Sequence, residues 1–221
     1  MEDKKPISGY FLDFLEDARD NIFGNERQTD LRKIADRYGL HFKKRIDYKD
    51  LNLEIRSFPL FRKGKRKRFS NILSRPEEEL NGTLQIFDCY KEDNLGDKAT
   101  TTVLIYSPKL DFEEFFIRPK RTTEKISGFF FQNERGLHLH PDFSKAFTVE
   151  TTDTEAVYFY LTEHLMELLT AFPNSSLKVK CGYLMYYEKG KMQKTEEILA
   201  FADRATEIAR TLIYDKSNEL V

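Results

Sequence analysis

Two histidines and an aspartate in the stretch "GLHLHPDF" (136–143) have the spacing of candidate metal ligands. Residues two apart on a strand point to the same face, so His138 and His140 would reach one ion and Asp142 would join them. Zinc normally takes three or four nitrogen or sulfur ligands. Two histidines do not close such a site, and we therefore favour a strand that ends at His140, before a proline.

The same stretch is similar to the HxHxDH motif of metallo-β-lactamase-like hydrolases, but Phe143 stands where that motif has its closing histidine. The chain has four histidines, and the other two are His41 and His164. His164 falls on the apolar stripe of an expected helix, where we interpret it as a hydrogen-bonded residue at the edge of the core.

The run "FRKGKRKRF" (61–69) is the second candidate site, because six of the seven residues 62–68 are Lys or Arg. Such a cluster is able to bind phosphate groups of nucleic acid or of lipid head groups. Phe61 and Phe69 flank it. The alternative is a solvated loop that turns at Gly64 and enters a strand, which is the usual role of a charge run.

Asp88 interrupts the apolar strand sequence "IFDCY", where a carboxylate needs a partner. Arg118, in "FFIRP", is the expected partner, and a structural ion pair or an exposed position is favoured over chemistry. Cys89 and Cys181 form no CxxC pair, so a thiolate metal site is not indicated. The sequence has no GxSxG, GxxxxGK[ST], GxGxxG or HExxH motif, and the protein is therefore expected to be no enzyme and to need no cofactor.

The composition points to a folded domain without a global preference for polyanions. Of the 221 residues, 40% are hydrophobic and 33% are charged, which excludes disorder over the whole chain. The formal net charge is −1, so any contact with nucleic acid or an anionic membrane must depend on local clusters. The first twenty residues lack the apolar region of a secretory signal, and no run is long enough to span a membrane. We expect a cytoplasmic protein, peripheral to the membrane if the basic run binds lipid.

The hydrophobic periodicity places helices first, then strands. Helical spacing over 7–23 and 29–38 precedes an expected strand "HFKKRI" and a short helix at 49–57. From about residue 69 the period changes to two. "TLQIFDCY" (83–90) places Leu84, Ile86 and Asp88 on one face, and "TTVLIYS" (101–107) is typical of a buried strand. A polar link between them predicts a hairpin, and "FEEFFIRP" predicts a further strand.

The C-terminal part is expected to contain two long amphipathic helices, at 153–172 and 195–214, separated by residues 176–191. That separating stretch is either two strands broken at Gly182 or one strand with a bulge there. The segregation of helices and strands predicts an α+β fold: a mostly antiparallel sheet with N-terminal helices and the two long C-terminal helices on one face. We divide the chain into an N-terminal helical segment (1–40) and an α+β domain (41–221) that together form one unit.

Three stretches, "NGTLQIFDCY", "TTVLIYSPKLDFEEFFIRP" and "HPDFSKAFTVETTDTEAV", resemble an uncharacterised family of bacterial α+β domains. That family has an FDY-like strand, an F-x-hydrophobic-RP strand and an FS-x-x-aromatic segment, and the resemblance covers about residues 30–215. Many members look membrane-anchored, whereas this sequence has no spanning segment. The resemblance implies a bacterial origin and the same fold, and it implies no catalytic residues.

Three hypotheses of function follow. The first is a non-enzymatic binding module that contacts a polyanion or an anionic surface, with weaker support for nucleic acid, through Arg62, Lys63, Lys65, Arg66, Lys67 and Arg68. The second is a metal-dependent hydrolase or metal-binding protein that uses His138, His140 and Asp142. The third is a structural or regulatory module that binds another protein through exposed aromatics in "ISGFFFQ" (126–132).

Overall fold

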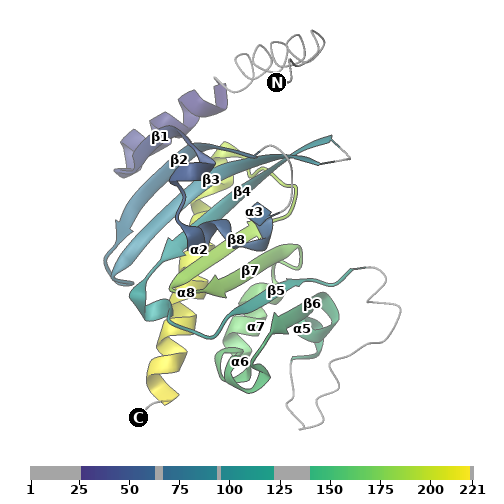
Figure 1. The fold of residues 1–221 in the computed structure, drawn as a ribbon. Coiled ribbons are helices and arrows are strands. Elements are labelled where there is room, and N and C mark those ends of the chain that lie inside the picture. Colours follow the sequence, from purple (N-terminus) through teal and green to yellow (C-terminus); the bar gives the residue numbers. More distant parts are fainter. Residues whose placement is uncertain (1–25, 63–66, 94–95, 122–139, 220–221) are drawn as a thin grey trace.

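The computed structural model describes residues 26–62, 67–93, 96–121 and 140–219, which form an antiparallel sheet of eight strands with helices on both of its faces (Figure 1). The strand order is β1-β2-β3-β4-β8-β7-β5-β6. The strands are β1 (His41–Ile46), β2 (Lys67–Glu77), β3 (Gly82–Asp93), β4 (Gly96–Tyr106), β5 (Phe115–Pro119), β6 (Phe147–Thr151), β7 (Ser175–Lys180) and β8 (Tyr183–Glu188). The expected α+β class with an antiparallel sheet is confirmed.

The helices are mostly short. Residues 26–38 form the first one described, which we call the Arg27 helix and which extends the expected helix at 29–38 by one turn. None of the described helices is long and apolar enough to cross a membrane. The others are α2 (Leu53–Arg56), α3 (Pro59–Arg62), α5 (Pro141–Ala146), α6 (Thr154–Tyr160), α7 (Glu163–Thr170) and α8 (Ile198–Glu219), with 3-10 turns η1 (Tyr48–Asp50), η2 (Pro108–Leu110) and η3 (Thr195–Glu197).

Only one of the two long C-terminal helices is present. The helix α8 has 22 residues, whereas the stretch 153–172 forms the two short helices α6 and α7. The break occurs because Thr162 leaves the helical conformation, with ψ 161°, and its hydroxyl accepts a hydrogen bond from the Leu165 amide. This N-cap satisfies an amide that a continuous helix would have bonded. His164 in the first turn of α7 is exposed, so its expected place at the edge of the core is wrong.

Each face of the sheet carries its own apolar core. On the first face, residues such as Leu84, Ile86 and Val103 pack with Leu31 of the Arg27 helix and with α7 and α8. On the second face, the next residues along the same strands pack under the segment 48–62: Phe87, Cys89, Leu104, Met185 and Tyr187. In Figure 1, α2 and α3 lie in front of the sheet and α8 lies behind it. The expected alternation is confirmed, but the helices cover both faces rather than one.

A two-residue turn separates β7 from β8 and settles which of the two alternatives for residues 176–191 holds. Cys181 and Gly182 have φ of 49° and 77°, the positive values that a type I′ hairpin turn requires at both positions. A side chain at Gly182 would also approach the Ser107 carbonyl oxygen to 3.2 Å. The stretch is therefore a tight hairpin, and its turn packs against the end of β4.

The long strand β2 contains a bulge. Its register against β3 shifts between Ser70 and Leu73, so that two residues of β2 oppose one residue of β3. Asn71, at the shift, has φ 56°, a left-handed conformation that asparagine tolerates better than most residues. The bulge lies beside Asp88, the partner of Ser70, and it positions the side chain of Asn71 for the site described next.

Candidate functional site

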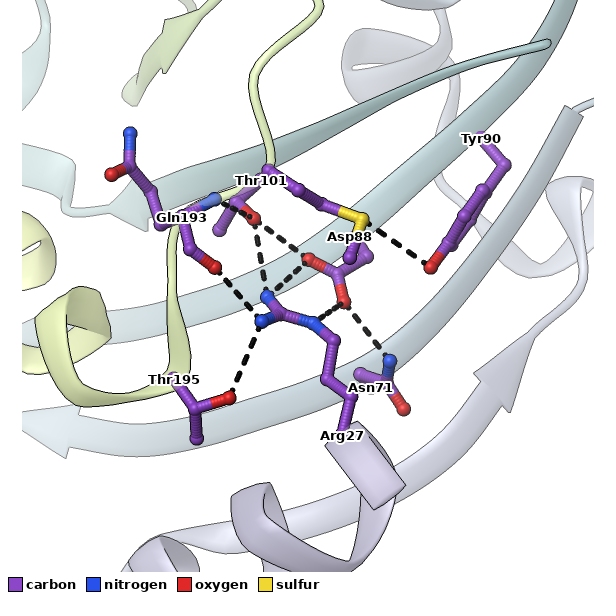
Figure 2. Close-up of polar contacts among 8 residues, drawn as sticks. Arg27, Asn71, Asp88, Tyr90, Thr101, Gln193 and Thr195 are labelled. Atoms are coloured by element: carbon purple, nitrogen blue, oxygen red, sulfur yellow. Dashed lines mark hydrogen bonds and ion pairs between the residues drawn. The ribbon is translucent and has the colours of Figure 1, made fainter. Parts of the chain in front are cut away.

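The buried carboxylate of Asp88 is the centre of a polar network on the first face of the sheet (Figure 2). Asp88 lies in the middle of β3, two residues after Ile86, and its relative exposure is 1%. It accepts four hydrogen bonds, two from Arg27, one from the Asn71 amide and one from the Thr101 hydroxyl. A carboxylate has about four lone-pair positions, so its accepting capacity is filled.

Arg27 reaches Asp88 from the first turn of the Arg27 helix. Its Nε and Nη2 donate to Oδ2 and Oδ1 of Asp88 over 2.8 and 3.0 Å, which is the bidentate geometry of a strong arginine–carboxylate pair. Its third nitrogen, Nη1, donates to the Gln193 carbonyl oxygen over 2.8 Å, with Thr195 Oγ1 at 3.5 Å. One guanidinium thus joins the helix, the sheet and the segment between β8 and α8.

Thr101 extends the network along that segment. Its hydroxyl donates to Asp88 Oδ1 over 2.8 Å and accepts from the Gln193 amide over 3.0 Å. Its own amide donates to the Lys191 carbonyl oxygen over 3.1 Å. The neighbouring Thr100 accepts from the Gly190 amide over 3.0 Å. The loop that leads from β8 into α8 is therefore fastened to β4 at both ends.

The electrostatics of the pair fit a permanent ion pair. Burial alone lowers the pKa of Arg27, but the hydrogen bond to Asp88 and the charge of Asp88 raise that pKa above its ordinary value. Because every acceptor position of Asp88 is occupied, its carboxylate has none left to take a proton from a substrate. The arrangement holds elements together and lacks the free base that acid–base chemistry needs.

Arg118 is not the partner of Asp88, and that expectation is wrong. Arg118 lies in β5, and its Nε donates to Glu150 of β6 over 2.5 Å. Three strands separate β5 from β3 in the sheet. A signal for the true partner exists in the sequence, because Arg27 precedes Leu31 by four residues and Ala35 by eight, which places it on the buried stripe of that helix.

The basic run continues from α3 into β2, and only part of it is described. Lys63, Lys65 and Arg66 lie outside the described residues, and Arg62 is described as the last residue of α3 without its side chain. The flanking rings of Phe61 and Phe69 are buried in the second core, 5.2 Å apart and perpendicular. They are core residues, so neither ring is available to a ligand.

The last two cations of the run, Lys67 and Arg68, begin β2. Lys67 lies directly opposite Lys91 of β3. Its ammonium donates to the Phe61 carbonyl oxygen, and burial lowers its pKa below the ordinary value. The Arg68 guanidinium lies 4.6 Å from the centroid of the Tyr90 ring.

The two cysteines are both free and lie apart in the fold. Cys89 is buried in the second core, where desolvation raises the pKa of its thiol to about 12. Cys181 is exposed in the β7–β8 turn. A buried thiol with a raised pKa is a poor nucleophile, because the thiolate is the reactive form.

The candidate metal ligands are described only in part, because His138 lies outside the described residues, as does the "ISGFFFQ" segment. His140 is the N-cap of α5, and its Nδ1 is buried without a hydrogen-bond partner. The carboxylate of Asp142 is exposed and pairs with Lys145 over 3.0 Å. Within the described ranges, no group of three or more His, Cys, Asp or Glu side chains could hold a metal ion.

Comparisons with protein-family models, with curated proteins and with solved structures found no match for this chain. Function must therefore be argued from the residues and their geometry.

Proposed function

We propose that this protein is a non-catalytic binding domain that contacts anionic lipid surfaces through the basic run at 62–68. The observation that carries the proposal is the cross-strand pair Lys67 and Lys91. Like charges directly opposite each other destabilise a sheet. A phosphate near this pair would be attracted by both ammonium groups.

The absence of a free base in the Asp88 network supports a binding role over catalysis. The buried state of Phe61 and Phe69 narrows the class of ligand. Proteins that bind single-stranded nucleic acid place aromatic rings under the bases, and these two rings are in the core. The basic run contributes electrostatic attraction, with a favourable binding free energy of about 1 kcal/mol per cation near an anionic bilayer. Lys67 and Arg68 are consecutive on β2 and point to opposite faces, so at most five of the six cations face one bilayer. Five cations would supply ~5 kcal/mol, a dissociation constant between millimolar and micromolar.

Vesicle co-sedimentation tests this proposal. The protein should bind vesicles of phosphatidylcholine with 30% phosphatidylserine, fail to bind phosphatidylcholine alone, and lose binding as salt rises through the range where surface charges are screened. Replacing the six cations of the run with glutamine should abolish binding. The matched control removes six exposed cations elsewhere, namely Lys33, Arg37, Lys109, Lys145, Lys189 and Lys194. If the control loses as much binding as the run variant, or if duplex DNA binds more tightly than the vesicles, the proposal is wrong.

The cytoplasmic location, the bacterial origin and the contact with another protein stay predictions, and the peripheral membrane location is part of this proposal. If the basic run binds lipid, this protein would associate with membranes, as the membrane-anchored members of the family that it resembles do.

A metal site is the second candidate function, and the orphan Nδ1 of His140 favours it. A buried imidazole nitrogen without a partner is suited to a metal ion, provided that His138 and Asp142 join it. Adding zinc to the metal-free protein should then raise its unfolding temperature, and the His140→Ala variant should show no such rise. An equal rise in both proteins, or no rise in either, would dismiss the site.

A further inference from the structure

Two cationic side chains lie over the ring of Tyr48 in the turn η1. The Lys67 ammonium nitrogen is 4.8 Å from the centroid of this ring, and the Arg56 guanidinium carbon is 5.8 Å from the same centroid. Tyr48 itself stacks on buried Phe69, with the ring centroids 6.2 Å apart. The turn η1, the end of α2 and the start of β2 thus bring an ammonium and a guanidinium to one aromatic ring on the second face of the sheet.

Neither cation has a carboxylate partner among the residues that the structure describes. Lys67 donates to a backbone carbonyl oxygen, and the Nε of Arg56 is buried without any hydrogen-bond partner. Asp47, the acid adjacent to Tyr48, lies toward Arg45 instead, with 3.9 Å between Nε and Oδ1. A buried guanidinium N–H that lacks an acceptor is costly, so an anion that reaches this donor would relieve that cost.

Lys91 adds a third positive charge to this place. The register puts it directly opposite Lys67, and the charges of both lysines act to lower the pKa of the Cys89 thiol, two residues before Lys91 on β3. Lys67 is half-buried at the start of β2, and burial lowers the pKa of its ammonium group. Cations that are already partly dehydrated lose less water when an anion binds, and they attract that anion more strongly than fully solvated ones.

We propose that Arg56 and Lys67, held over Tyr48, form a subsite for a single phosphate group. A guanidinium offers a planar fork of donors that matches phosphate oxygens, and an ammonium at the same ring adds a compact charge. The inference rests on the proposed function through Lys67, which belongs to the basic run, and goes beyond it through Arg56, which does not. It changes the expected contact from diffuse attraction to binding by two defined donors.

Pyrophosphate is the free probe, and isothermal titration measures its binding. The wild-type chain should bind it, and the Arg56→Gln variant should bind roughly tenfold or more weakly, the loss expected for one hydrogen-bonded charge. Arg32→Gln is the matched control, because Arg32 also lies over a ring, that of Phe42 at 5.1 Å, but on the Arg27 helix. Arg56→Lys keeps the charge and removes the Nε donor, so it should recover only part of the affinity.

A measurement on the wild-type chain tests the subsite even if a variant fails to fold. The Arg56 Nε–H resonance, assigned by its absence from the Arg56→Lys spectrum, should shift and exchange more slowly with water when pyrophosphate is added. No change in that resonance would overturn the subsite.

Vesicles distinguish the source of the phosphate. If 5% phosphatidylinositol 4,5-bisphosphate strengthens vesicle binding of the wild type but not of Arg56→Gln, and pyrophosphate competes, the subsite takes a lipid phosphate monoester. If pyrophosphate binds through Arg56 and the bisphosphate lipid adds nothing, the subsite stands and its ligand is a soluble phosphate. If neutralising the run abolishes vesicle binding while Arg56→Gln binds both probes as the wild type does, the subsite is wrong and the proposed function survives. If neither change affects binding, both fail.

Discussion

Replacing Arg27 with methionine should destabilise the fold by about 3–5 kcal/mol, the cost of removing one partner of a buried ion pair. The magnitude follows from the contacts. Asp88 would lose two of its four hydrogen bonds and its countercharge, while its exposure of 1% denies it water. Hydrogen bonds to charged groups contribute about 1.5–3 kcal/mol each, so two of them account for ~3–6 kcal/mol.

Urea unfolding followed by circular dichroism measures this loss, and thermal unfolding should show a fall of about 10 °C for a chain of this size. The control is Arg37→Met, the same substitution on the exposed side of the same helix, which should change stability by less than about 0.5 kcal/mol. Hydrogen exchange should accelerate in the Arg27 helix and in the loop 189–194, because Arg27 fastens both to the sheet.

The double variant Arg27→Met with Asp88→Asn sharpens the test. Asparagine carries no charge and keeps a carbonyl oxygen for Thr101 or Asn71, so the double variant should be more stable than Arg27→Met alone. The reasoning is refuted if Arg27→Met loses less than about 1 kcal/mol, or if the second substitution deepens the loss instead of relieving it.

Three further outcomes test other parts of the fold. In the native protein a thiol reagent at pH 8 should label Cys181 and spare Cys89, whose pKa is raised to about 12 by burial; labelling of both at equal rates would contradict the second core. In urea unfolding, Gly182→Ala should lose roughly 1–2 kcal/mol more stability than Gly190→Ala. Both glycines have positive φ, but only a Cβ at Gly182 would come within 3.2 Å of a carbonyl oxygen. Equal losses would mean that this close contact does not destabilise the variant. Burial acts to raise the pKa of Glu114, but the hydrogen bonds to Lys178 and Lys180 outweigh burial and hold this pKa below its ordinary value of 4.5. The stabilisation by Glu114 should therefore be complete above pH 4.5 and be lost as the pH falls through the lower pKa of the folded state. The difference in stability between wild type and Glu114→Gln should accordingly disappear in acid.

The hydrophobic pattern of the sequence predicted much of the strand arrangement. The alternation of Leu84 and Ile86 with Phe87 and Cys89 corresponds to the two cores, and the run around Val103 is a buried strand. These predictions hold because side-chain direction on a strand depends only on the backbone. The same pattern does not reveal the break between α6 and α7, because the apolar stripe continues across it. The N-cap hydrogen bond of Thr162 interrupts the helix without interrupting the stripe.

The contacts of the candidate site required knowledge that no local pattern contains. The sequence indicates that Asp88 needs a partner and that Arg27 lies on a buried helical stripe, but the choice between Arg27 and Arg118 depends on which elements are neighbours in the fold. The bulge at Asn71 has no signal beyond the tolerance of asparagine for positive φ. The approach of Arg56 and Lys67 to the ring of Tyr48 likewise depends on how α2, β2 and η1 pack together. Such contacts depend on the topology of the fold, and the topology depends on the whole chain rather than on any short stretch of its sequence.

The strand order has a consequence for biosynthesis. The strands β1 to β4 pair with their sequence neighbours, but β4 acquires its second partner only when β8 appears, with Thr102 opposite Tyr187 and Tyr106 opposite Tyr183. The ribosome reaches Tyr187 about 80 residues after Tyr106, which takes ~4–16 s at ~5–20 residues per second. During that interval the nascent chain presents the apolar edge of Val103, Leu104 and Ile105 to its surroundings. We therefore expect the unpaired edge of β4 to stay open to aggregation for as long as the ribosome takes to translate from β4 to β8, so slower codons in that stretch should lengthen the exposure.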